Sequence, residues 1–127
     1  MKSAIIFLFI ALVSLNGQAQ TNEDLIGEWA MESAADVGED VTAQQDPHNE
    51  RWIEFQSNGS FKSDGRPFGR DAGQWTYDDA SHTLALKSNS GDNESKWLVH
   101  FDGDKLSWRG LGEGNKATMI VTYMRMP

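Results

Sequence analysis

Short runs that alternate between apolar and polar residues make up most of this chain after its first twenty positions. A period of two is typical of strands with one buried face, and no stretch keeps the 3.6-residue period of an amphipathic helix. Gly, Asn, Asp and Ser interrupt the runs at short intervals, which indicates an all-β domain with many turns. The pattern predicts eight strands, at residues 25–33, 50–56, 59–63, 73–78, 82–88, 95–101, 105–109 and 117–125.

The connections between these strands alternate between long and short. Three are tight turns and four are longer loops, the turns at residues 57–59, 78–81 and 102–104 and the loops at 34–49, 64–72, 89–94 and 110–116. Successive connections of an up-and-down meander lie at opposite ends of the sheet, so we expect every long loop at one open end. Eight antiparallel strands can close into a barrel that holds one small ligand or is filled by side chains. We therefore predict an eight-stranded antiparallel up-and-down barrel, with an open two-sheet sandwich as the alternative.

The first residues have the pattern of a secretory signal peptide. Lys2 precedes an apolar run from Ala4 to Leu15, and small residues follow before a cleavage site that we place after Ala19. The run is shorter than the ~20 apolar residues that span a bilayer, although an uncleaved anchor is the alternative. We expect a signal peptide at 1–19 and one domain at 20–127, in a protein that is secreted or periplasmic.

The mature chain of 108 residues is strongly acidic, with 10 basic and 19 acidic residues and a formal charge of −9 once Lys2 is removed. Such a chain lacks the clustered cations that bind a phosphate backbone, which argues against nucleic acid and anionic membranes as partners. The absence of cysteine excludes disulfides, thiolate zinc sites and thiol catalysis. An exported domain without disulfides fits a bacterial protein best.

Catalytic and metal-binding patterns are weak in this sequence. His48, His82 and His100 fall on different predicted elements and at different ends of the barrel. The segment from Asp102 begins like a calcium loop, but Leu106 stands where the third oxygen ligand is required. No phosphate loop, dinucleotide fingerprint or Gly-x-Ser-x-Gly is present. We expect no catalytic residue, no metal and no cofactor.

Two motif positions at the closed end carry a family resemblance. Gly27-Glu28-Trp29 opens the first predicted strand, and Arg125 closes the last. Lipocalins, and calycins more widely, place a Gly-x-Trp and an arginine in these two positions, and the arginine packs over the tryptophan. The mature chain therefore resembles a miniature lipocalin-like domain of the compact exported kind found in bacteria. The resemblance implies a structural role for Trp29 and Arg125, joined by a cation–π contact. Full-sized lipocalins have longer strands and an extra helix, so the short chain argues against a deep cavity.

Four of the five tryptophans, all except Trp29, lie in the strand halves that we expect nearest the open end. Alternation points Trp75, Trp97 and Trp108 inward, and Met31 on the first strand accompanies them. Indole walls suit an apolar or ring-shaped ligand, and the four residues are our candidate pocket. The alternative is that these side chains simply fill the barrel. Trp52 is out of step with its apolar neighbours and is expected outside the barrel or beside a bulge.

A second candidate group for ligand binding is the segment RPFGR in the second long loop. Arg66 and Arg70 flank Phe68 there, and at the rim they could meet a carboxylate or phosphate of a ligand. A solvated loop is the alternative. The long first loop, with Pro47 and His48, is a lid candidate by its position only.

These features predict an exported lipocalin-like protein that binds or carries a small hydrophobic or aromatic molecule at its open end, without catalysis. The alternative is a filled barrel that contacts other proteins through its loops, as an inhibitor or accessory subunit. A third hypothesis is avidin-like binding, because those barrels also carry a Gly-x-Trp and hold their ligand with tryptophans. The sequence has no further match to the polar ligand-binding residues of that family.

Overall fold

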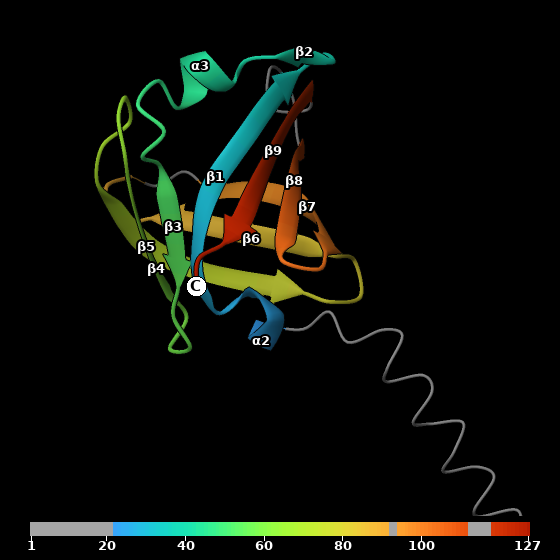
Figure 1. Ribbon diagram of the computed structural model, residues 1–127. Helices are drawn as coiled ribbons and strands as arrows, with labels where there is room; N and C mark the ends of the chain where they lie inside the picture. Colours follow the sequence, from blue (N-terminus) through green and yellow to red (C-terminus); the bar gives the residue numbers. More distant parts are fainter. Residues whose placement is uncertain (1–21, 92–93, 112–117) are drawn as a thin grey trace, which may run out of the picture.

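The computed structural model describes residues 22–91, 94–111 and 118–127 (Figure 1). The expected signal peptide at 1–19 lies outside the described residues, as do parts of the loops predicted at 89–94 and 110–116.

The described residues form nine antiparallel strands joined in sequence order. They are β1 (Gly27–Asp36), β2 (Glu39–Asp40), β3 (Trp52–Phe55), β4 (Ser60–Asp64), β5 (Asp71–Asp78), β6 (Thr83–Ser88), β7 (Glu94–Asp102), β8 (Lys105–Leu111) and β9 (Met119–Arg125). Each strand pairs with the next, except that β2 pairs only with β1 and β1 continues the sheet with β3. Pairing of β1 with β9 closes the sheet, so β1 and β3–β9 form an eight-stranded barrel. The predicted fold class is confirmed, and closure excludes the open sandwich.

Alternate residues of each strand point into the barrel. In β5 the buried positions are Gly73, Trp75 and Tyr77, and in β8 they are Leu106, Trp108 and Gly110. The first strand departs from this rule, because its register against β9 shifts between Met31 and Ser33. Such a bulge adds one residue and changes the parity of the strand. Both Met31 and Ala34 are therefore buried although they are three positions apart.

The first long connection contains more structure than its sequence predicted. A loop was expected at 34–49, but β1 continues to Asp36 and turns through Val37 and Gly38, both with positive φ, into β2. A one-turn helix, α3 (Thr42–Gln45), follows. The Thr42 side chain links it to β1, since the Ala34 amide donates to its Oγ1 at 3.0 Å. Figure 1 shows β2 and α3 together at one end of the barrel.

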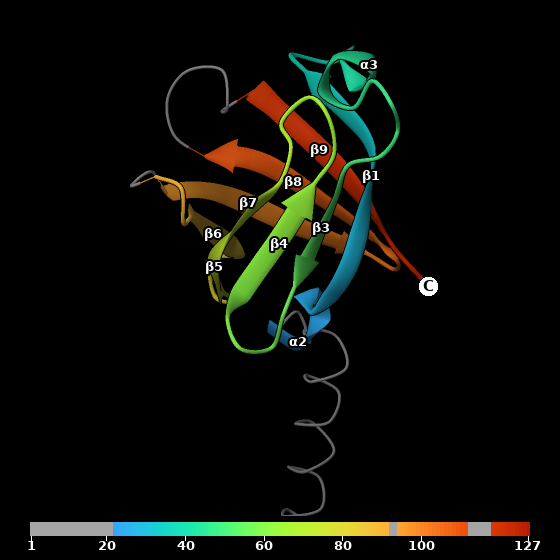
Figure 2. The same ribbon diagram turned by 90° about the vertical axis from the view of Figure 1, so that its left-hand side faces the viewer.

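The opposite end is closed by the short helix α2 (Asn22–Leu25) and by tight turns (Figure 2). Leu25 is fully buried, and its carbonyl accepts a 2.9 Å hydrogen bond from Trp29 Nε1. The Arg125 guanidinium lies 4.2 Å from the Trp29 ring centroid. It donates to the carbonyls of Asp24, at 2.6 Å, and Ile26, at 3.1 Å. The packing of Arg125 over Trp29 that the motifs predicted is thus confirmed.

Gly27 is required at this end for two reasons. Its φ of +129° is rarely adopted by residues with a side chain, and a Cβ would lie 2.9 Å from Nη1 of Arg125. The glycine therefore gives the guanidinium room to reach both carbonyls.

Replacing Arg125 with Met should lower the free energy of unfolding by about 2–4 kcal/mol, since a cation–π contact and two charge-assisted hydrogen bonds are lost. Urea denaturation of both proteins measures the difference. Arg109→Met is the matched control, because Arg109 is exposed on β8 and its loss removes the same charge. Equal destabilisation by the two substitutions would contradict the role of Arg125.

Candidate functional site

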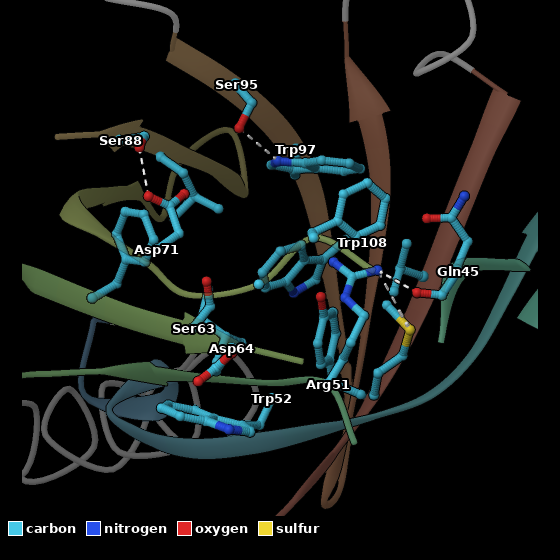
Figure 3. A pocket seen from close by; sticks show the side chains of 18 of the residues that line it. Gln45, Arg51, Trp52, Ser63, Asp64, Asp71, Ser88, Ser95, Trp97 and Trp108 are labelled. Carbon is cyan, nitrogen blue, oxygen red and sulfur yellow. Dashed lines mark hydrogen bonds between the residues drawn. The ribbon is translucent and has the colours of Figure 1, made fainter. Parts of the chain in front are cut away.

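The barrel holds a cavity of about 620 Å³ toward the end that carries the long loops (Figure 3). This volume is within the range of about 300–1,000 Å³ usual for small-molecule sites. The other half of the barrel is filled, and its largest fully buried side chains are Trp29, Phe55, Leu25, Leu84 and Leu106. The molecule therefore combines a solid closed end with a hollow open end.

An aromatic wall forms one side of the cavity. The rings of Trp97 and Trp108 are 5.6 Å apart, and those of Trp108 and Tyr123 are 4.6 Å apart. Trp97 is half-buried, and its Nε1 donates to Ser95 Oγ at 3.1 Å. Trp108 is only 3% exposed, and its Nε1 has no hydrogen-bond partner among the described residues. The wall thus offers flat apolar surface, and it contains one enclosed N–H donor that has no acceptor in the described chain.

Arg51 brings a positive charge into the cavity from the loop before β3. The buried carboxylate of Asp46 fixes this loop, because it accepts from the amides of Glu50, at 2.8 Å, and Arg51, at 3.3 Å. The Arg51 side chain donates through Nη1 to the Gln45 carbonyl at 3.0 Å, and its guanidinium lies 4.5 Å from the centre of the Phe68 ring. Figure 3 shows Arg51 and its hydrogen bond to Gln45 within the cavity. No carboxylate pairs with Arg51 in the described part of the chain.

Tyr123 lines the same cavity from β9. The pKa of its hydroxyl is raised to about 12, chiefly by burial; the positive charge of Arg51 opposes this rise and the negative charge of Asp46 adds to it. The hydroxyl therefore stays protonated at ordinary pH and can donate a hydrogen bond.

The rim of the cavity is polar and carries more negative than positive charge. Asp71 accepts a 2.6 Å hydrogen bond from Ser88 Oγ. Arg70 is exposed and lies 3.7 Å from a carboxylate oxygen of Asp64. Glu94 completes the acidic groups of the lining.

Five of the seven predicted binding residues line this cavity, namely Met31, Phe68, Arg70, Trp97 and Trp108. Trp75 does not, because its indole packs edge-on against Phe55 and donates to the carbonyl of Gln56 at 3.0 Å, beside a closed-end turn. Trp52, expected outside the barrel or beside a bulge, is half-buried and belongs to the lining.

Arg66 also lies outside the lining, where it pairs with Glu50. Its Nε and Nη2 each donate to the carboxylate at 2.9 Å, and its amide donates at 2.8 Å. These hydrogen bonds lower the pKa of Glu50 to about 2. The pair ties the β4–β5 loop to the residues before β3.

Sequence reasoning missed Arg51 and Tyr123. Tyr123 alternates with buried Val121, but both faces of the last strand are apolar, so parity alone could not orient it. Arg51 precedes its strand, and only the turn fixed by Asp46 directs it inward.

Within 22–91, 94–111 and 118–127, no three His, Cys, Asp or Glu side chains come together as a metal site. In the same residues, no helix combines the length and the apolar character that crossing a membrane requires.

No protein-family model matches the chain, and no curated protein matches it. Among solved structures, it is similar to the crystal structure of a DUF4847 family protein from Bacteroides vulgatus, with a TM-score of 0.56 and 14% sequence identity. The match covers 79% of this chain and 92% of the Bacteroides protein. An identity this low shows a likeness of fold alone, that of a small β-barrel.

Proposed function

We propose that this protein is an exported lipocalin-like carrier that binds a small hydrophobic or aromatic molecule in the open end of its barrel, without catalysis. The observation that carries the proposal is the cavity of about 620 Å³ beside Trp97 and Trp108. Indole faces give large contact area to a flat apolar ligand, and the enclosing strands remove that surface from water.

The contrast between the two ends of the barrel supports this proposal over a filled barrel. Protein interiors are close-packed, and empty volume forfeits contacts between the atoms that line it. The closed half of this molecule reaches such packing around Trp29 and Phe55, whereas the open half does not. Both halves are lined by large apolar and aromatic side chains, so the cavity in the open half supports a ligand-binding role over a filled barrel.

The export and family parts of the proposal rest on the sequence and the closed end. The leader at 1–19 has the pattern of a signal peptide, so we place the protein in the periplasm or outside the cell. The arrangement of Gly27, Trp29 and Arg125 supports a lipocalin-like relationship.

A protein-interaction role is the second candidate, favoured by apolar side chains on the outer surface. Leu98 and Ile120 are exposed on β7 and β9, and both line a shallow depression with His100 and Arg109. In that role the outer face of the barrel, rather than its cavity, would contact the partner.

Native mass spectra of the protein purified from its own periplasm or medium should show a constant mass excess that organic extraction removes. A ligand held by the cavity survives gentle ionisation, and the released compound can be identified directly. A bare mass, with no shift on addition of lipids, retinoids or haem-like aromatics, would contradict the carrier proposal. It would favour a protein-interaction role for the outer surface of the barrel.

Replacing Trp97 with Ala should reduce the fraction of protein that carries this mass excess at least tenfold, while the free energy of unfolding changes by less than about 1.5 kcal/mol, because Trp97 is only half-buried. Trp75→Ala is the matched control. Trp75 is buried outside the cavity, so its loss should cost about 3–5 kcal/mol of stability. Urea denaturation and native mass spectrometry give the two quantities. Equal loss of stability in both variants, with unchanged occupancy, would assign Trp97 to the core instead.

A further inference from the structure

Three side chains that line the cavity carry hydrogen-bond donors, and each would bind an acceptor oxygen of a ligand. Building on the carrier function proposed above, we propose that the ligand is a monocarboxylate with a flat or elongated apolar body. Its carboxylate binds the Arg51 guanidinium, with Trp108 Nε1 and the Tyr123 hydroxyl as further donors, and its body lies against Trp97.

The first group is the cation of Arg51. Arg70, which also lines the cavity, has a carboxylate partner in Asp64, and Arg66 of the same loop, outside the lining, has one in Glu50, although both arginines are more exposed. Arg51 is half-buried and pairs with no carboxylate of the described chain. Enclosed charges in proteins are rarely left without a partner. A guanidinium has five N–H donors, and among the described residues only Nη1 donates, to the Gln45 carbonyl at 3.0 Å and to the weak acceptor Met31 Sδ at 4.0 Å.

The position of Arg51 is also prepared before any ligand binds. Asp46 holds its backbone amide, Gln45 holds Nη1, and the Phe68 ring packs on the guanidinium plane. A cation fixed on three sides loses little freedom on binding, which favours affinity.

The second group is the indole of Trp108. Its Nε1 is buried and unpartnered among the described residues, and an indole N–H can only donate. A buried donor without an acceptor is destabilising, and native structures contain few of them. Trp108 lines the cavity, but its Nε1 is itself enclosed, so an acceptor on a ligand would reach it through a small shift of the neighbouring side chains.

The third group is Tyr123, which connects the other two. Its ring lies 4.6 Å from that of Trp108, and its hydroxyl is close enough to Arg51 for the positive charge to lower its pKa. Burial nevertheless keeps the hydroxyl protonated. The lining of one cavity thus includes a cation and two neighbouring aromatic side chains that carry hydrogen-bond donors.

These donors select a carboxylate over other oxygen groups. A carboxylate has two oxygens with about four acceptor positions and matches the fork of an arginine, whereas an alcohol or ketone leaves the guanidinium charge unpaired. A phosphate carries up to two negative charges, which Asp64, Asp71 and Glu94 at the rim oppose. A single negative charge on an apolar body therefore fits the lining best.

The test compares 2-naphthoate with its neutral isostere 2-naphthamide by isothermal titration calorimetry, on the exported protein freed of bound compounds. We expect the carboxylate to bind roughly tenfold to a hundredfold more tightly, as for a charge-assisted hydrogen bond in an enclosed site. Arg51→Met should abolish this preference and change the affinity for the amide less than threefold. Arg51→Lys, which keeps the charge, should retain part of the preference. Trp108→Phe should weaken both probes, because the amide carbonyl also accepts from the indole.

The matched control is Arg109→Met, which removes the same charge from the outer face of β8 and should leave both affinities unchanged. Equal affinity of the two probes for the unmodified protein would overturn the carboxylate inference while leaving the carrier function intact. The carboxylate inference would also be overturned, and the carrier function kept, if neither 2-naphthoate nor dodecanoate binds with a dissociation constant below about 1 mM while native spectra show a neutral co-purified compound. The same failure with a bare native mass would overturn both proposals.

Discussion

The pairing of β1 with β9, secured by Arg125 over Trp29, is the constraint on which the rest of the molecule depends. Closure removes the sheet edges and gives the barrel an inside, and the arginine ties the last strand to the segment that precedes the first. The Arg125 contacts lie at the end covered by α2, and the long connections lie at the other end (Figures 1 and 2). The half of the barrel beside Trp29 and α2 is filled by side chains, and the half beside the long connections contains the cavity.

The open end then depends on a second, smaller anchor. Asp46 organises the turn before β3, and Glu50 in the same turn binds Arg66 of the β4–β5 loop. Two long connections are thereby fastened together, with Arg51 between them and Phe68 packed on its guanidinium. Surface ion pairs contribute little stability, so the importance of the Glu50–Arg66 pair lies in positioning. It sets where the cation enters the cavity.

The sequence was sufficient for the parts that depend on local patterns. Strand periodicity and the alternation of loop lengths predicted the eight-stranded barrel, and parity correctly turned Trp97 and Trp108 inward. Prediction from the sequence failed where the position of a side chain depends on its depth along the barrel axis or on pairing between distant residues. Trp75 shares the parity of the cavity residues but sits beside the closed-end turn at Gln56, which only the register between strands reveals. Arg66 meets Glu50 across 16 positions, and Tyr123 belongs to a strand with two apolar faces. No local pattern encodes these relationships.

The inner cavity also explains how occupancy and stability are linked. Among the described residues, Trp108 Nε1 has no hydrogen-bond acceptor and Arg51 has no carboxylate partner. A domain of this size without disulfides has a small margin of stability, so unmet donors are a noticeable fraction of it. In the proposed carrier, a ligand that supplies these acceptors would bind only the folded barrel and would stabilise it in proportion to the logarithm of its concentration. In the proposed carrier, the same groups would therefore govern both the stability of the fold and the choice of ligand.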